Sequence, residues 1–171
     1  MTLHIGTKLI NAQPMTRAAY NTLRGWALPA DENGDDDGYL VEYMDGGKAN
    51  HPGYEGYISW SPADVFERSY RLYKGMDFGN ALAALKMGLK VARAGWNGKG
   101  MWLILVAGTP NAALREGTPY REALGQESCE ILPHIDMWTT NSEGRRAMLC
   151  GWLASQTDML SDDWEIVQCV S

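Results

Sequence analysis

The stretch Phe78–Val106, FGNALAALKMGLKVARAGWNGKGMWLILV, decides the fold of this sequence. Its first ten residues carry apolar side chains at the spacing of one helical face, and the Gly88 that follows is typical of a helix end. Two short apolar runs come next, residues 89–94 and 101–106, and each predicts a strand. Between them stands Asn97-Gly98, the strongest short hairpin signal. We therefore expect a helix followed by an antiparallel strand pair.

Further strands are predicted toward the end of the chain, over residues 135–139, 146–149 and 164–170. Residues 108–130 contain no long periodic segment and are expected to be loop-like. The fold class that follows is α+β, with two small domains, the C-terminal one a helix packed on an antiparallel sheet.

A domain boundary is predicted next to Lys74-Gly75-Met76, because Asp77 is able to cap a new helix there. The expected domains are residues 1–75 and 76–171. The sequence of residues 1–75 predicts a small α+β module. Its expected strands cover residues 5–12, 39–44 and 57–60. Its expected helices are one capped by Thr16 and ended by Gly25, and one with Ser61 as its N-cap and Pro62 in its first position.

Composition limits the classes of partner. The chain has 171 residues, of which 45% are apolar, and its 15 basic and 21 acidic residues give a net charge of −6. A protein that binds nucleic acid polymers normally carries a basic face, so such polymers are not expected partners. No segment reaches the roughly 20 apolar residues of a membrane span, and no signal peptide is expected at the N-terminus. Cys129, Cys150 and Cys169 form no CxxC pair and are expected to be reduced thiols.

Two sequence patterns raise a metal or a catalytic interpretation. Residues 31–42 place oxygen-bearing side chains at several positions of a calcium loop, but Asp36 stands where that loop needs glycine. The alternatives are a solvated acidic loop and a weak divalent-cation site. His134 and Asp136 share one strand face and allow either a catalytic pair or a histidine that satisfies a neighbouring carboxylate. No nucleophile elbow or phosphate loop accompanies them.

Two tryptophan-containing segments have the composition of a binding site. Residues 96–100, WNGKG, offer an aromatic face, an amide, a cation and backbone N–H groups, and residues 152–158, WLASQTD, offer another aromatic ring, hydroxyls, an amide and a carboxylate. Such groups stack bases, bind ribose hydroxyls and hold phosphates. The alternative is that both tryptophans belong to the core and that the polar groups are turn and cap residues.

The second half of the chain resembles the second family of phage Thoeris anti-defence sponges. The resemblance covers residues 76 to about 168 and rests on these blocks in the same order: FGNALAALK from Phe78, GLKVAR from Gly88, GWNGKGM from Gly95, HIDM from His134, WLASQTDML from Trp152 and DDW from Asp162.

The resemblance implies a protein that binds a cyclic nucleotide-like immune signal, chiefly glycocyclic ADP-ribose and in some members cyclic dinucleotides, without cleaving it. It implies no enzyme activity and no cofactor, a homo-oligomer (dimer or tetramer) with pockets between protomers, and action in the host cytoplasm. Trp96 is then expected to stack on adenine, with Lys99 either balancing phosphate charge or solvated. The other implied ligand-binding residues are Asn97, Gly98, Met101, Trp152, Ala154, Ser155, Gln156, Thr157 and Asp158.

Other hypotheses remain beside this one. A hydrolase or lyase of the same signal would use His134 and Asp136, and a protein-interaction module would present the tryptophans as a contact surface. Residues 5–73 resemble a small module of phage accessory proteins without a known activity. The role of residues 1–75 and any pocket contacts from residues 109–130 are left open by the sequence.

Overall fold

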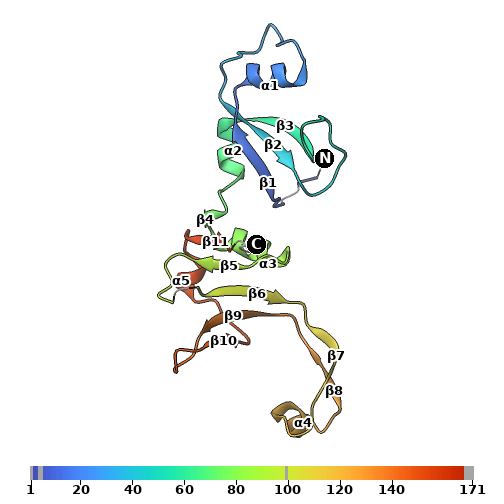
Figure 1. Cartoon of the computed structure of the whole chain (residues 1–171), viewed down its shortest axis with the longest axis vertical. Coiled ribbons are helices and arrows are strands. Elements are labelled where there is room, and N and C mark those ends of the chain that lie inside the picture. Colours follow the sequence, from blue (N-terminus) through green and yellow to red (C-terminus); the bar gives the residue numbers. More distant parts are fainter. Residues whose placement is uncertain (1, 4–5, 99, 168–171) are drawn as a thin grey trace. The chain divides into compact units, whose positions relative to one another are not determined.

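The computed structural model describes residues 2–3, 6–98 and 100–167, and the chain divides into two compact units, Met1–Arg71 and Leu72–Ser171. Figure 1 labels their helices and strands. The first unit contains β1 (Ile10–Pro14), α1 (Arg17–Arg24), β2 (Gly38–Tyr43), β3 (Tyr57–Pro62) and α2 (Ala63–Ser69). Its three strands form an antiparallel sheet in the order β1-β2-β3.

Helix α1 begins and ends where the sequence predicts. The hydroxyl of Thr16 accepts a hydrogen bond from the Ala19 amide, and Gly25 ends the helix with a left-handed φ of 69°. The helix buries Tyr20 against Leu40 and Ile58 of the sheet, and these three side chains are the core of the first unit.

Helix α2 begins one residue later than expected. Ser61 lies in β3, and Pro62 occupies the N-cap without a side-chain hydrogen bond, so the predicted Ser61 cap is wrong. Because Ser61 pairs with Tyr39 in the sheet, its backbone continues β3 up to the helix. The helix contacts the sheet through Phe66, whose ring stacks on Tyr39 with centroids 4.0 Å apart.

The second unit holds a six-stranded antiparallel sheet in the order β10-β9-β6-β5-β11-β4. Its strands are β4 (Lys74–Met76), β5 (Val91–Arg93), β6 (Trp102–Val106), β9 (His134–Thr140), β10 (Arg146–Leu149) and β11 (Trp164–Ile166). β4 spans the boundary at residue 75, because it pairs with β11 as the edge strand of this sheet. The strand expected over residues 5–12 begins at Ile10, and residue 5 lies outside the described residues. The last strand was expected to reach residue 170, and residues 168–170 also lie outside the described residues.

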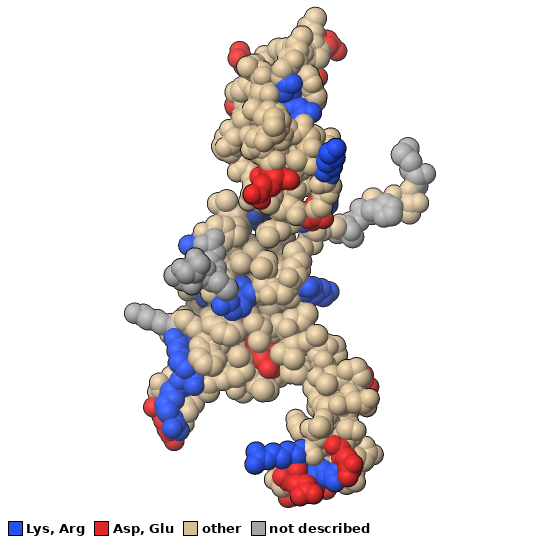
Figure 2. Space-filling view, turned by 45° about the vertical axis from the view of Figure 1, so that its right-hand side comes forward, with Lys and Arg blue, Asp and Glu red and all other residues tan. Residues whose placement is uncertain are grey.

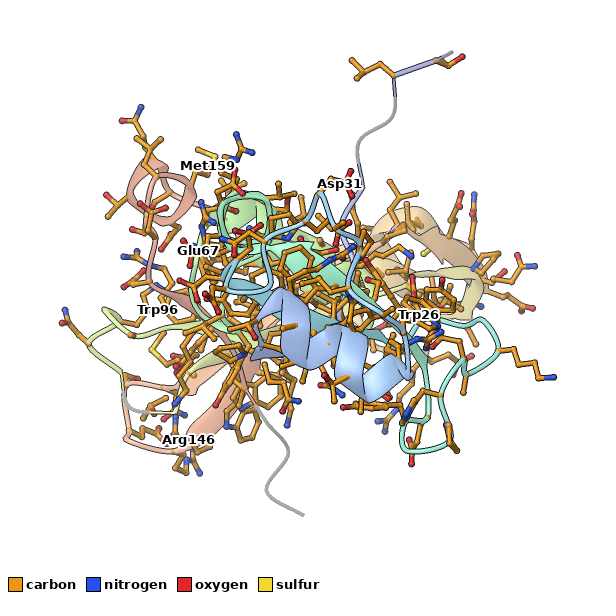
Figure 3. The ribbon with its side chains drawn as sticks, turned by 90° about the horizontal axis from the view of Figure 1, so that it is seen from above. Trp26, Asp31, Glu67, Trp96, Arg146 and Met159 are labelled. Atoms are coloured by element: carbon orange, nitrogen blue, oxygen red, sulfur yellow. The ribbon has the colours of Figure 1, made fainter. Side chains whose placement is uncertain are left out.

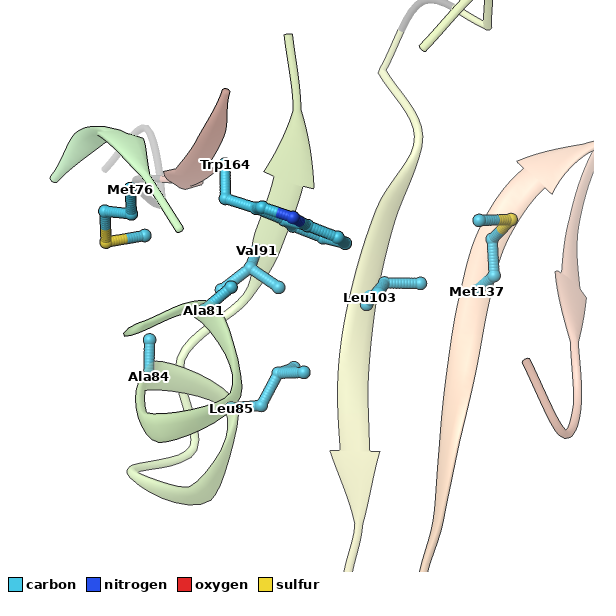
Figure 4. Packing of buried hydrophobic residues seen from close by; sticks show 8 residues of the cluster. All are labelled: Met76, Ala81, Ala84, Leu85, Val91, Leu103, Met137 and Trp164. Carbon is cyan, nitrogen blue, oxygen red and sulfur yellow. The ribbon is translucent and has the colours of Figure 1, made fainter. Parts of the chain in front are cut away.

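Helix α3 (Phe78–Lys86) packs on one face of this sheet. The Asp77 carboxylate caps it, accepting a hydrogen bond of 2.8 Å from the Asn80 amide. The buried side chains between helix and sheet are Met76, Ala81, Ala84, Leu85, Val91, Leu103, Met137 and Trp164. Figure 4 shows the Trp164 ring lying across β5 in the middle of this cluster. The second unit is therefore a helix packed on an antiparallel sheet, and the α+β class is confirmed.

Residues 108–130 are not a loop, which corrects the prediction. β7 (Thr109–Ala113) pairs with β8 (Ser128–Ile131) in a two-stranded ribbon, and α4 (Pro119–Leu124) lies at its far end. The pairing is between distant strands and bulged between Thr109 and Ala112, so no local periodicity marks it. The ribbon projects from the sheet, and Figure 2 shows both acidic and basic side chains around its tip.

Asn97-Gly98 does not form the predicted tight hairpin. A two-residue hairpin of this kind needs positive φ at both residues, and neither has it. β5 and β6 are joined instead by the longer segment 94–101, in which Gly98 packs against Met101. A Cβ at Gly98 would lie 2.0 Å from the Met101 sulfur, so any larger residue there would have to displace the Met101 side chain.

Candidate ligand-binding site

The segment 94–101, here called the Trp96 loop, is one half of the candidate site. Its backbone is held at Gly95, whose N–H donates 2.7 Å to a carboxylate oxygen of Asp163. A Cβ at Gly95 would stand 2.5 Å from that same oxygen, so the close approach requires glycine. The Trp96 ring is half-buried and packs on the core, and Figure 3 labels its position.

The segment Trp152–Asp158 is the other half. The Trp152 amide donates 2.6 Å to the Ile135 carbonyl, which anchors the segment alongside β9. The short helix α5 (Gln156–Met159) begins at Ser155 with a complete capping box. The Ser155 hydroxyl and the Asp158 carboxylate each satisfy a backbone N–H of the other residue.

The structure brings the two halves together through three tryptophans. The Trp96 and Trp152 ring centroids lie 6.2 Å apart at an interplanar angle of 64°, and both rings meet the edge or face of Trp164. Trp164 is fully buried. A base sandwiched between two rings needs parallel planes about 7 Å apart, a geometry that this edge-to-face cluster does not offer. Within one chain the Trp96 and Trp152 rings therefore do not enclose a base between parallel faces.

Asp158 connects the two halves electrostatically. Its Oδ1 accepts hydrogen bonds from Arg93 at 2.8 Å and from the Trp96 indole at 3.1 Å, while Oδ2 accepts from the Ser155 hydroxyl and amide. Its backbone carbonyl also accepts a 2.9 Å bond from the Trp164 indole. Burial alone would raise the pKa of Asp158, but the hydrogen bonds from Ser155, Arg93 and Trp96 outweigh it and lower the pKa to about 2.

The predicted site residues differ in exposure. Those that reach solvent are Asn97, Ser155, Gln156 and Thr157; the half-buried ones are Trp96, Gly98, Met101, Trp152 and Ala154; and Asp158 is buried. Lys99 lies outside the described residues. Ser155 and Asp158 hydrogen-bond each other, and Asp158 also bonds Trp96. The groups available to a ligand are therefore the exposed amides of Asn97 and Gln156, the Thr157 hydroxyl and the tryptophan rings.

Arg93 and Asp163 belong to this site and were not predicted. Both Arg93 nitrogens facing Asp163 donate to its carboxylate, at 2.7 and 3.3 Å, and Arg93 has a raised pKa chiefly because of the Asp163 hydrogen bond. A largely buried cation at the end of a short apolar strand requires a carboxylate partner, and Arg93 directly follows Val91 and Ala92 in the sequence. The partner itself is not identifiable from local spacing, because it lies 70 residues away.

His134 and Asp136 lie on the other face of the sheet from the tryptophan cluster. They alternate along β9 with Ile135 and Met137, which pack into the core. Asp136 is buried and accepts 3.0 Å from the Gly151 amide, and its Oδ1 lies 3.5 Å from His134 Nε2. The other ring nitrogen of His134 is 2.8 Å from the Leu132 carbonyl. Asp136 is therefore paired with both the Gly151 amide and the His134 ring.

The acidic stretch folds back onto helix α1. The backbone carbonyls of Gly34 and Asp36 accept the amides of Ala18 and Arg17, and Glu32 pairs with the Arg17 guanidinium at 2.7 Å. Within residues 2–3, 6–98 and 100–167, no three His, Cys, Asp or Glu side chains are grouped to hold a metal ion. Cys129 and Cys150 are free thiols, and Cys169 lies outside the described residues.

A groove of about 680 Å³ lies in the first unit and is separate from the tryptophan cluster. It is lined by Arg17, Glu32, Asp36, Asp37, Trp60, Pro62, Ala63 and Asp64. The Arg17 guanidinium covers the Trp60 ring at 5.0 Å and pairs with Glu32, so the cation and the aromatic face that line the groove are engaged with each other.

The class of protein that these observations define is an α+β domain, helix on antiparallel sheet, with a tryptophan-centred surface site. The chain belongs to the Thoeris anti-defense 2-like domain family, whose model matches residues 76–167. A curated relative, "Thoeris anti-defense 2" of Bacillus phage SP01, is 37% identical over 92 residues, which cover 54% of this chain and 94% of the relative. This family membership supports a phage anti-defence role and a small signal molecule as partner. In the part of the chain that the structure describes, no helix is long and apolar enough to cross a membrane.

Proposed function

We propose that this chain binds a cyclic ADP-ribose-type immune signal, glycocyclic ADP-ribose first among them, and sequesters it without cleaving it. The observation that carries the proposal is the joining of the Trp96 loop to the Trp152–Asp158 segment through Asp158, within the region that matches the family. Half-buried indole rings beside exposed amide and hydroxyl groups are suited to a nucleotide with an adenine base.

The proposed roles follow the chemistry of each group. Trp96 stacks on the base with its outer face, because its inner edge packs against Trp152 and Trp164. Asn97, Gln156 and Thr157 are exposed and supply hydrogen bonds to ribose and phosphate oxygens. Gly98, Met101, Trp152, Ala154 and Ser155 shape the surface between the two segments, and Asp158 holds them in place.

The site is proposed to lie in residues 76–171 of a homo-oligomer, a dimer or a tetramer, that acts in the host cytoplasm. Support for the oligomer comes from large apolar side chains exposed beside the site, since Leu153 is 89% exposed and Leu160 is 76% exposed. Such side chains are usually covered by another protein surface when they are grouped. Cyclic dinucleotides are the second ligand class to test.

Sequestration requires a low dissociation constant. To hold the free signal below the threshold of an effector, the dissociation constant must be near nanomolar, about −12 kcal/mol. Calorimetric titration of the full chain with glycocyclic ADP-ribose measures it directly. Millimolar affinity or no heat of binding would contradict the proposal.

A release experiment separates sequestration from catalysis. The saturated protein is denatured by heat, and the supernatant is assayed for intact signal. Full recovery is the expected result, because no step of the proposal breaks a bond in the ligand. Loss of the signal at substoichiometric protein, abolished by His134→Ala, would instead support the hydrolase hypothesis.

The matched pair Trp96→Ala and Trp26→Ala tests the position of the site. Loss of one base–aromatic stack costs about 2 kcal/mol, so Trp96→Ala is expected to weaken binding by about 30-fold. Trp26 is 55% exposed and belongs to the first unit, so Trp26→Ala is expected to bind as the wild type does. Equal affinities of wild type and Trp96→Ala would show that the ligand binds elsewhere.

A further inference from the structure

Arg93 lies at the point where three segments of the second unit meet. It projects from β5, its side chain is 11% exposed, and its guanidinium binds the carboxylates of Asp158 and Asp163 at 2.8 and 2.7 Å. One carboxylate belongs to α5 and the other directly precedes β11. A planar guanidinium with five donors can hold two carboxylates in fixed directions, whereas a lysine ammonium cannot.

Asp163 links Arg93 to the start of the Trp96 loop through hydrogen bonds. One of its oxygens accepts from Arg93 and from the Gly95 amide, and its backbone carbonyl accepts a 3.0 Å hydrogen bond from the Ala94 amide. Two consecutive backbone N–H groups of the loop are therefore held by a single residue. Their direction sets the direction in which the next residue, Trp96, leaves the strand.

Asp158 links Arg93 to the ring of Trp96. The same oxygen that binds Arg93 accepts the Trp96 indole N–H at 3.1 Å. The ring is thus fixed at its base through Asp163 and at its polar edge through Asp158, and Arg93 is common to both connections. Removal of Arg93 would leave two buried or half-buried carboxylates without their cation.

We propose that Arg93 and Asp163 are positioning residues of the ligand site: they hold the Trp96 ring in its binding orientation before the ligand arrives. This inference rests on the proposed function for its effect on affinity. The physical reason is preorganisation, because a ring that is already ordered loses little conformational freedom when it binds. Neither residue is required to touch the ligand.

The first measurement needs no ligand. The near-ultraviolet circular dichroism of Trp96 is obtained as a difference spectrum. For the wild type and for each variant, the spectrum of the same protein with the additional substitution Trp96→Phe is subtracted. In Arg93→Lys and in Asp163→Asn we expect this difference signal to fall to less than about half of the wild-type value, because the ring is no longer fixed at both ends. Asp163→Asn is included because its amide oxygen can still accept from the Gly95 amide, whereas the charge and one of the two acceptors for Arg93 are removed.

Two variants serve as controls for this measurement. Arg145→Lys changes an exposed arginine in the turn between β9 and β10, and is expected to leave the Trp96 signal unchanged. Ala84→Gly destabilises buried α3 without touching the network, by about 1 kcal/mol, and is expected to lower the melting temperature while the Trp96 signal remains. A Trp96 signal that stays at the wild-type level in both Arg93→Lys and Asp163→Asn overturns the proposal.

The second measurement is titration with glycocyclic ADP-ribose. Arg93→Lys is expected to bind about tenfold more weakly than wild type, equal to about 1.4 kcal/mol, whereas Ala84→Gly binds normally. Equal loss of affinity in Arg93→Lys and Ala84→Gly overturns the positioning role, since it would follow from stability alone. If the wild type does not bind this nucleotide, the proposed function fails, but the ligand-free signal still decides whether Arg93 and Asp163 position Trp96.

Discussion

At the residue scale, the chemistry of the site depends on how one carboxylate is used. Asp158 was expected to contact a ligand, and in the structure its two oxygens accept from Arg93, Trp96 and Ser155. Each of these donors lies within the same unit. The residue therefore joins two segments, and the hydrogen bonds from Ser155, Arg93 and Trp96 lower its pKa to about 2, so the folded chain favours the ionised form.

This pKa predicts a specific acid sensitivity. Because the pKa of Asp158 in the folded chain lies below its ordinary value of 3.8, ionised Asp158 stabilises the fold above pH 4. That stabilisation, about 2 kcal/mol, is lost as the pH falls toward 2. Asp158→Asn resembles the protonated acid, so its deficit in the free energy of unfolding is expected to be largest near pH 6 and to close near pH 2.

Native-state hydrogen exchange of peptides from α3 measures this difference between wild type and Asp158→Asn at each pH. Comparison of the two proteins at the same pH removes the intrinsic pH dependence of exchange. A deficit that stays constant from pH 6 to pH 2 would mean that the Asp158 charge does not contribute to stability.

At the scale of elements, the helix N-termini show where residue type and position alone are sufficient to predict a cap. Thr16 and Asp77 accept the backbone N–H groups that the first turn of a helix leaves unpaired, and both caps were predicted from position alone. Ser61 had the right residue type but is drawn into β3 by its pairing with Tyr39. Sheet pairing with a distant strand thus overrode a local capping signal.

This contrast predicts different costs for two similar substitutions. Asp77→Ala removes a cap hydrogen bond of 2.8 Å and is expected to lower the free energy of unfolding of the second unit by about 1 kcal/mol. Ser61→Ala removes no cap and is expected to change the stability of the first unit by less than about 0.5 kcal/mol. Denaturant titration followed by hydrogen exchange in α2 and α3 reports the two units separately. A larger loss in Ser61→Ala than in Asp77→Ala would contradict the observed cap positions.

At the scale of the whole molecule, the described residues form two hydrophobic cores that share no residue. Ile58 and Leu40 belong to the cluster of the first unit, whereas Leu103 and Trp164 belong to that of the second. The second core lies under the tryptophan cluster of the candidate site, because Trp164 contacts both Trp96 and Trp152.

A core substitution in one unit is therefore expected to act within that unit. Ile58→Ala removes a fully buried side chain and is expected to cost the first unit about 2–5 kcal/mol. Exchange protection of β6 and β9 in the second unit should remain within about 0.5 kcal/mol of wild type. Hydrogen exchange resolved by peptide measures both effects in one experiment, and an equal loss of protection in β6 would show that the two cores are energetically coupled.

The amino-acid sequence by itself determined the caps of α1 and α3, most of the strands and the family, because these depend on side chains within a few residues of one another or on contiguous blocks such as GWNGKGM and WLASQTD. Only the tertiary structure decided the ribbon β7–β8, the edge-to-face geometry of the tryptophans and the hydrogen bonds that join Arg93, Asp158 and Asp163. The physical reason is separation along the chain: the two ion pairs of Arg93 join residues 65 and 70 positions apart, and no local pattern specifies which distant carboxylates packing will bring to a buried cation.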